Sequence, residues 1–111
     1  MSAKRGELWT AAGGAGRLAA KPRPALVVQS DLFASADFVT VALVTSTRVE
    51  SPTRIRLVAT PETGLERESW VMADKLHTIP RLSLLTRCGV IPTQAMVAVE
   101  RAILVYLGIA E

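Results

Sequence analysis

Apolar and polar residues alternate with a period of two in several segments of the chain, which predicts a protein built mainly of β-strands. Residues 23–30 are apolar on both faces, as is typical of a central strand that is covered from both sides. Residues 54–59 alternate cleanly, with Arg54 and Arg56 on the polar face, which indicates a half-buried strand. The expected strands cover residues 7–12, 23–30, 38–47, 54–59, 69–79 and 87–91.

The period changes to that of an α-helix near the C-terminus. Pro92 is placed to open this helix, and Gly108 is placed to end it after Leu107. Its apolar stripe consists of Met96, Val99, Ile103 and Leu107, widened by Ala95, Ala98, Ala102 and Tyr106. One short helical turn is also expected after Ser30, which can cap it. Strands followed by one terminal helix favour a mainly β (α+β) fold, either a small barrel or a curled sheet with appended helices.

The segment 69–79 is expected to be a long strand with two different faces. Alternation divides its side chains into an apolar and a polar set: Trp70, Met72 and Leu76 against Lys75 and His77. The polar set would place two nitrogen-bearing side chains together on an exposed surface.

Length and composition allow one domain spanning residues 1–111, with a single hydrophobic core. Half of the residues are apolar but only 5% are aromatic, so the core is expected to be aliphatic. The chain has one cysteine, Cys88, and one histidine, His77, which excludes an internal disulfide, a cysteine-based zinc site and a histidine cluster. We therefore expect no metal ion and no other cofactor.

The net charge of +3 is concentrated at the N-terminal end. The first 30 residues carry five basic side chains and one acidic one, whereas the rest of the chain carries eight basic and nine acidic ones. This imbalance suggests an anionic partner, nucleic acid first, although a solvated N-terminal arm explains it equally well. No apolar signal-peptide core follows the basic start, and no apolar run approaches the roughly 18 residues that cross a bilayer. We expect a cytoplasmic protein without a membrane partner.

Several catalytic patterns are present only in part. Residues 14–19 match the dinucleotide-binding spacing G-x-G-x-x-A, but Pro22 and Pro24 leave no room for the helix that this motif needs. His77 and Asp74 lie three residues apart on an extended segment and therefore face opposite sides, which makes a poor catalytic triad. His77 alone stays a candidate general base, with an inert histidine as the simpler reading. The clustered carboxylates are typical of a solvated loop: Glu62, Glu66 and Glu68.

Arg23 is the strongest single candidate for chemistry. It begins a buried central strand directly after a glycine-rich loop, so its backbone is held while its side chain can face the loop. An arginine fork suits a phosphate and, better, a transition state in which a phosphate gains charge. Its candidate companions on exposed faces are Thr45, Arg54, Arg56 and Lys75. A strand-end arginine in a surface ion pair is the simpler alternative.

Three stretches of the sequence point to one family. They are Arg5-Gly6-Glu7-Leu8-Trp9, then K-P-R-P-A-L-V-V over residues 21–28, and G-L-E-R-E-S-W-V-M-A-D over residues 64–74. Together they resemble the MazF/PemK family of toxins from bacterial toxin–antitoxin pairs. The R-G-[ED]-[LIV]-W opening and the R-P-[AV]-[LV]-V strand are specific in combination, and the likeness runs from about residue 5 to residue 108.

The resemblance implies an SH3-like small barrel of the MazF/CcdB type with a C-terminal helix, assembled as a homodimer. It also implies a metal-independent endoribonuclease that cuts single-stranded RNA, chiefly messenger RNA, at short sequences. Cleavage would leave a 2′,3′-cyclic phosphate and a 5′-hydroxyl. A cognate antitoxin would block the RNA groove with a disordered tail.

The resemblance also assigns catalytic roles, because the family's catalytic arginine falls on Arg23 and its catalytic threonine or serine on Thr45. The substrate's own 2′-hydroxyl would attack, so the enzyme needs a cation for the phosphorane, a proton donor for the leaving 5′-oxygen and a hydrogen bond that holds the phosphate. Arg23 can supply the first and is a candidate for the second, and Thr45 can supply the third. The side chains expected to contact RNA are Arg17, Lys21, Ser46, Arg54, Lys75 and His77.

The chain departs from the family pattern in places. Ala15-Gly16-Arg17 stands where Gly-Ser-Glu is common, which removes an acidic side chain that could act as a base. Lys75 replaces a common glutamine and His77 a common basic residue, so base recognition should differ, and His77 becomes a candidate for proton transfer. The alternative is a CcdB-like toxin that poisons DNA gyrase by binding, and a catalytically inactive relative is a third reading.

Overall fold

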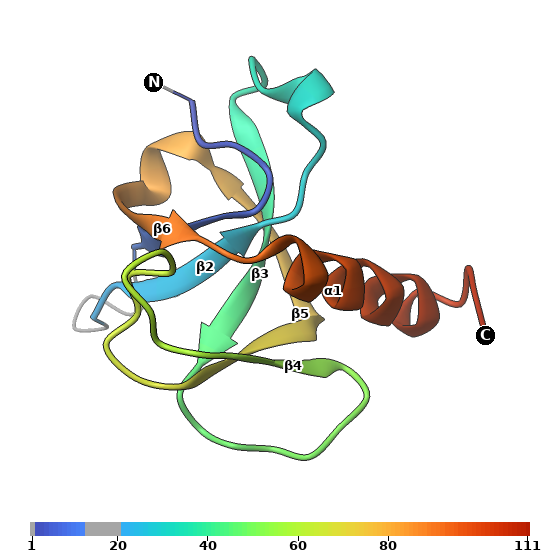
Figure 1. Cartoon of the computed structure of the whole chain (residues 1–111). Helices are drawn as coiled ribbons and strands as arrows, with labels where there is room; N and C mark the ends of the chain where they lie inside the picture. The colour runs from blue at the N-terminus through green and yellow to red at the C-terminus, as the bar shows by residue number, and fades with distance from the viewer. Residues whose placement is uncertain (1, 13–20) are drawn as a thin grey trace.

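The computed structural model describes residues 2–12 and 21–111, and six antiparallel strands form its centre. The strands are β1 (Glu7–Ala11), β2 (Arg23–Val27), β3 (Phe38–Thr45), β4 (Arg54–Leu57), β5 (Ser69–Pro80) and β6 (Leu84–Val90). They form one curled sheet in the order β4-β5-β3-β2-β1-β6, and α1 (Thr93–Tyr106) lies beside it (Figure 1). The predicted mainly β fold with one terminal helix is confirmed.

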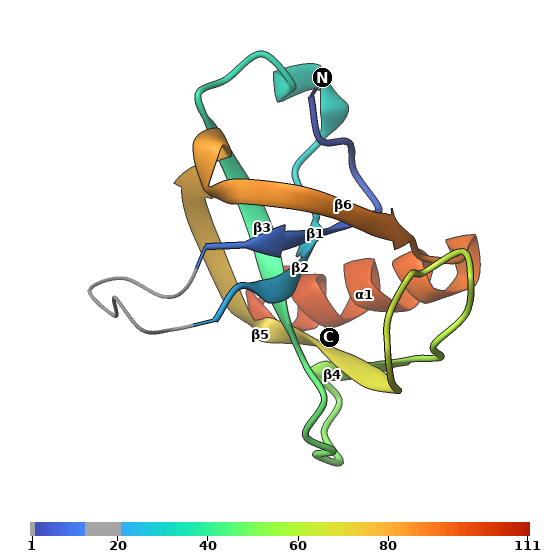
Figure 2. The same cartoon turned by 90° about the vertical axis from the view of Figure 1, so that its left-hand side faces the viewer.

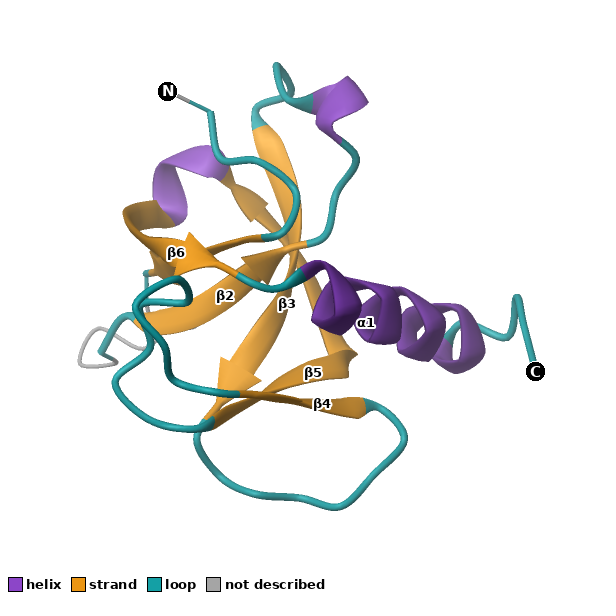
Figure 3. Cartoon of the chain, in the orientation of Figure 1, coloured by secondary structure: helices purple, strands orange, loops and turns teal. Residues whose placement is uncertain are grey.

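Two short helical turns lie between strands of the described chain, one between β2 and β3 and one between β5 and β6. Figure 3 shows both in purple, as it does α1. The first, η1 (Asp31–Phe33), is capped by the Ser30 side chain, as predicted, because its hydroxyl accepts the Leu32 N–H at 3.1 Å. The second, η2 (Arg81–Ser83), was not predicted. It leads into β6, which begins three residues before the predicted strand. No helix in the described part of the chain is long and apolar enough to cross a membrane.

The end of α1 follows the prediction closely. Gly108 adopts a left-handed φ of +77°, which glycine tolerates because it has no Cβ. Its N–H bonds the Val105 carbonyl at 3.1 Å, and the Ile109 N–H bonds the Leu104 carbonyl at 2.9 Å. These bonds satisfy carbonyls that have no partner within the helix, so the helix ends here.

A cluster of buried apolar side chains lies on each face of the sheet. The cluster beneath α1 contains Leu8, Leu26, Ala42, Val44, Leu57, Val71, Ile91 and Val99. The opposite cluster contains Ala3, Ala11, Ala25, Val27, Val39 and Val41. Figure 2 shows α1 behind the strands, on one face of the sheet, whose edge strand β6 pairs with β1. Burial from both sides explains why the centre of β2 is apolar throughout, as the sequence predicted.

β5 is irregular where it pairs with β3. Ala42 lies opposite Leu76 and Val44 lies opposite Val71, so β5 uses five residues where β3 uses two. The irregularity resets the alternation, and Leu76 packs against the same cluster as Val71. Trp70 lies opposite Thr45 on the other side of the sheet. The predicted common face of Trp70, Met72 and Leu76 is therefore wrong.

The N-terminal segment is fastened to the helix through Arg5. Its guanidinium donates to the Val28 carbonyl and pairs with Glu100 on α1. Its backbone N–H donates to the Asp31 carboxylate at 2.8 Å. These contacts hold the start of β1, and with it the neighbouring strand β2, in a fixed position relative to α1.

Candidate functional site

The two predicted catalytic side chains come from neighbouring antiparallel strands. In the pairing of β2 with β3, Ala25 lies opposite Leu43. Arg23 starts β2 and Thr45 ends β3, and each lies two residues beyond that pair. Continuing the register therefore puts Arg23 and Thr45 opposite each other and on the same face of the sheet. Arg23 is exposed and Thr45 is partly exposed, so both can reach a ligand.

The contacts that the structure shows for Arg23 and Thr45 leave both side chains able to bind a ligand. Within residues 2–12 and 21–111, no carboxylate pairs with Arg23, so the surface ion pair has no partner in this part of the chain. The Thr45 hydroxyl oxygen accepts the Thr47 N–H at 3.1 Å. This bond orients the oxygen and leaves its proton available for a phosphate oxygen.

A pocket adjoins Thr45 along the same row of the sheet. Thr45 lies opposite Trp70 in β5, and Trp70 lies opposite Arg56 in β4. The loop that follows Thr45 forms the other side of this open pocket, whose volume is about 340 Å³. The pocket is lined by Arg48, Val49, Glu50, Ser51, Arg54, Arg56, Glu68 and Trp70. Sequence reasoning placed Trp70 on the apolar face of its strand and Glu68 in a solvated loop, and so did not predict this pocket.

Arg54 borders the pocket but is held by Asp74. Its Nε donates to one carboxylate oxygen at 3.0 Å and its Nη2 to the other at 3.3 Å. The two side chains are only 15% and 24% exposed. The hydrogen bond from Arg54 lowers the pKa of Asp74, although burial acts in the opposite direction. Arg54, predicted to contact RNA, therefore has only its other donors free for a ligand.

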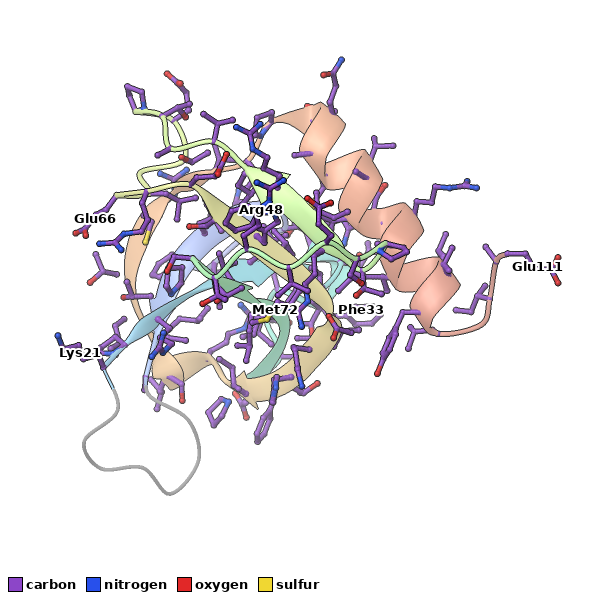
Figure 4. All side chains as sticks on the ribbon, turned by 90° about the horizontal axis from the view of Figure 1, so that it is seen from below. Lys21, Phe33, Arg48, Glu66, Met72 and Glu111 are labelled. Carbon is purple, nitrogen blue, oxygen red and sulfur yellow. The ribbon has the colours of Figure 1, made fainter. Side chains whose placement is uncertain are left out.

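The remaining predicted RNA contacts are spread over the surface. Lys21 is exposed two residues before β2, and Ser46 is exposed directly after β3, so both lie close in sequence to the Arg23–Thr45 pair. Figure 4 shows Lys21 at the edge opposite the free end of α1. Arg17, like the whole G-x-G-x-x-A segment, lies outside the described residues.

His77 and Lys75 are exposed on β5, as predicted. His77 lies opposite Val41, which is four residues from Thr45 along β3. At the rise of a β-strand this is about 13 Å, too far for His77 to exchange a proton at a phosphate bound to Thr45 of the same chain. Lys75 lies in the irregular part of β5, between these two positions.

Two other titratable side chains, Glu7 and Cys88, have pKa values that their surroundings in the fold shift. Burial raises the pKa of Glu7, but hydrogen bonds from the Lys4 N–H, the Trp9 indole and Arg87 outweigh it, so the net pKa is lowered. Burial raises the pKa of the Cys88 thiol. A bound carboxylate and a protonated thiol are poor nucleophiles. Within the described ranges, no three side chains of His, Cys, Asp or Glu gather as a metal site would require.

Comparison with known proteins gives a consistent result. The family described as "PemK-like, MazF-like toxin of type II toxin-antitoxin system" matches residues 4–107. A protein of Mycolicibacterium smegmatis named "Probable endoribonuclease MazF" is 44% identical over 108 residues, which cover 96% of this chain and 98% of that protein.

Solved structures share the fold over almost the whole chain. A mycobacterial endoribonuclease solved with its cognate antitoxin superposes with a TM-score of 0.80, at 22% identity and 99% coverage of both chains. The Mycobacterium tuberculosis toxin MazF-mt6 gives 0.79, at 25% identity and coverage of 92% and 96%. MazF from Deinococcus radiodurans also gives 0.79, at 21% identity and coverage of 97% and 98%. The predicted MazF-type architecture is confirmed.

Proposed function

This chain belongs to the PemK/MazF family of toxins of type II toxin–antitoxin systems, and we propose that it is an endoribonuclease that cuts single-stranded RNA, chiefly messenger RNA. One domain of residues 1–111 would carry the whole activity. The observation that supports the proposal is the pairing of β2 with β3, because continuing its register by two residues puts Arg23 opposite Thr45.

The proposed reaction is attack of the substrate's 2′-hydroxyl on the adjacent phosphorus. A bond forms from the 2′-oxygen to phosphorus as the 2′-hydroxyl proton passes to solvent, and the bond to the 5′-oxygen breaks as that oxygen takes up a proton. The products are a 2′,3′-cyclic phosphate and a 5′-hydroxyl. Arg23 stabilises the negative charge that develops on the phosphorane oxygens, and it is the candidate donor of the proton that the leaving 5′-oxygen takes up. The Thr45 hydroxyl donates to a phosphate oxygen and fixes its position. The need for a 2′-hydroxyl makes RNA the substrate rather than DNA.

Contacts to the RNA backbone would surround this pair. Lys21 and Ser46 lie beside it in sequence, and Arg17 precedes Lys21 by four residues. Arg54 offers the donors that Asp74 does not use. Lys75 and His77 extend the contact surface along β5. Phosphate contacts of this kind supply affinity and position, but little sequence preference.

A cognate antitoxin and a second copy of the chain are the proposed protein partners. A fold relative was solved with its cognate antitoxin. α1 and the residues that follow it expose several large apolar side chains, more than a single chain needs to leave in water. These side chains are Val97, Leu104, Val105, Tyr106, Leu107 and Ile109. Messenger RNA as substrate implies that the protein acts in the cytoplasm.

Cleavage of a long single-stranded RNA in excess EDTA tests the proposal. The wild type should produce fragments with 5′-hydroxyl ends, and R23A and T45V should each lose about 100-fold or more in rate. T45S, which keeps the hydroxyl, and R101A, which removes an exposed arginine of α1, are the matched controls. Full cleavage by R23A and T45V would refute this site. Intact RNA with the wild type would refute the nuclease and favour the CcdB-like alternative, which the family match disfavours.

A further inference from the structure

The pocket next to Thr45 is positioned to receive part of any RNA bound at the catalytic pair. Trp70 lies opposite Thr45 in the neighbouring strand, so their backbones are about 5 Å apart. The opposite wall begins three residues after Thr45, at Arg48. A nucleotide whose phosphate contacts Thr45 therefore has the pocket directly beside it.

The size and lining of the pocket match a nucleotide. Its volume of about 340 Å³ lies within the range of small-ligand sites. Trp70 is 8% exposed, so only a small part of the indole faces the pocket, and burial fixes the position of this aromatic contact. Bases of single-stranded RNA commonly pack against aromatic rings and guanidinium planes, and three arginines accompany this indole.

The polar groups of the pocket include acceptors as well as donors. Glu50 and Glu68 line it together with the arginines. Two carboxylates would repel an acidic peptide, whereas the edge of a base presents both donors and acceptors and can satisfy both kinds of side chain. The chemistry of the lining therefore favours a nucleobase over an acidic segment of a protein.

One ion pair in the pocket is well suited to read that base. Arg56 pairs with Glu68 and the two side chains remain 62% and 43% exposed, so they can turn from each other toward a ligand. Arg54 is held by Asp74. The Arg48–Glu50 pair is still more exposed and lies entirely within the loop, so it is less well ordered for recognition.

We propose that this pocket holds the nucleotide next to the cleaved phosphate, and that Arg56 and Glu68 determine which base is accepted there. The inference rests on the proposed endoribonuclease function. In it Trp70 is the wall against which the base lies, Arg56 donates to the base edge and Glu68 accepts from it. Neither Arg56 nor Glu68 takes part in breaking the phosphodiester bond.

Mapping of 5′ ends after cleavage of a single-stranded RNA of randomised sequence tests this proposal. E68Q and R56A should each lower the preference for one base, at one position beside the cut, by about tenfold or more. Preferences at other positions should not change, and RNAs with the newly tolerated base should be cut at rates within a few-fold of wild type. E66Q and R67A make the same charge changes on the loop before β5 but do not line the pocket, and both should keep the wild-type profile.

The possible failures are distinguishable. Unchanged profiles for E68Q and R56A, with active wild type, would overturn the pocket assignment and leave the nuclease intact. An equal loss of cleavage at every sequence would mean that the pair is structural, and would also overturn it. If R56A binds a labelled oligo-aspartate peptide more weakly than wild type and keeps an unchanged base profile, the pocket would be assigned to an acidic protein segment instead. A wild type that cuts no RNA would remove both proposals together.

Discussion

The ion pair between Arg54 and Asp74 joins the edge strand β4 to β5, and replacing Asp74 with asparagine should measurably destabilise the fold. Each carboxylate oxygen accepts a hydrogen bond from the same guanidinium, at 3.0 and 3.3 Å. Both side chains are more than three-quarters buried. D74N keeps the shape of the side chain but removes its charge and one acceptor, so the Arg54 fork is left partly unpaired away from water.

The expected loss in unfolding free energy lies between two known cases. Exposed ion pairs contribute up to about 1 kcal/mol, and removing one partner of a fully buried pair costs about 3–5 kcal/mol. A bidentate pair at this depth should therefore lose about 2 kcal/mol, which agrees with the usual contribution of hydrogen bonds to charged groups. For a chain of this size, that corresponds to a fall in Tm of about 8 °C.

The effect should depend on pH in a definite direction. The pKa of Asp74 is lowered in the folded state, chiefly by its hydrogen bond from Arg54. The unfolded value is about 3.9, so the pair's contribution is fully present above that pH and is lost as the pH falls through the folded pKa. The difference in stability between wild type and D74N should therefore be largest at neutral pH and should shrink below about pH 4.

Urea unfolding of both proteins at fixed protein concentration, at pH 7 and at points down to pH 3, measures this difference directly. The matched control is E50Q, because the Arg48–Glu50 pair has a 2.6 Å contact but side chains that are 73% and 83% exposed. E50Q should stay within about 0.5 kcal/mol of wild type. A D74N protein as stable as E50Q at pH 7, or a gap that stays constant to pH 3, would refute the reasoning.

Two further predictions concern packing. G89A should lower the unfolding free energy by about 2 kcal/mol or more in urea titration, because a Cβ there would overlap the backbone of Glu62 and Thr63; a stability equal to wild type would show that this loop can move away. The wild type should be a dimer by light scattering at micromolar concentration, and L107E, which places a charge on the apolar end of α1, should be a monomer with an unchanged circular dichroism spectrum. A dimeric L107E would place the contact elsewhere.

Local sequence patterns were sufficient for most of the fold. The strands are short-range features, because alternation of buried and exposed side chains is visible within each of them. Pro92 and Gly108 mark the ends of α1 through backbone preferences that need no partner. The start of β6 was not predicted. Leu84 packs against the opposite cluster, the one on the face away from α1, whereas the adjacent Leu85 is exposed, so two neighbouring leucines hide the alternation of buried and exposed positions.

Features that depend on pairing between distant segments could not be read in this way. The extra residues of β5 are defined only by its pairing with β3, and simple alternation, which ignores them, predicts that Leu76 shares a face with Trp70. The bond between Arg54 and Asp74 joins residues 20 positions apart. The sequence alone therefore predicts Arg54 as an exposed RNA contact and does not reveal its partner Asp74. The pocket combines a loop, an edge strand and the start of β5, so no single window of sequence contains it.

The position of each group in the sheet gives a physical reason for separating catalysis from recognition. Arg23 is the first residue of β2 and Thr45 is the last residue of β3. Both strands are central in the sheet and buried on both faces, so the two apolar clusters hold the backbones of these residues in place. Arg56 belongs to β4, a four-residue strand at the edge of the sheet, and its side chain is largely exposed. Replacing this exposed side chain, unlike the buried Arg54 on the same strand, costs little stability and does not displace the central strands. Base preference can therefore change at the edge while the catalytic pair stays in place, which is what the E68Q and R56A profiles would reveal.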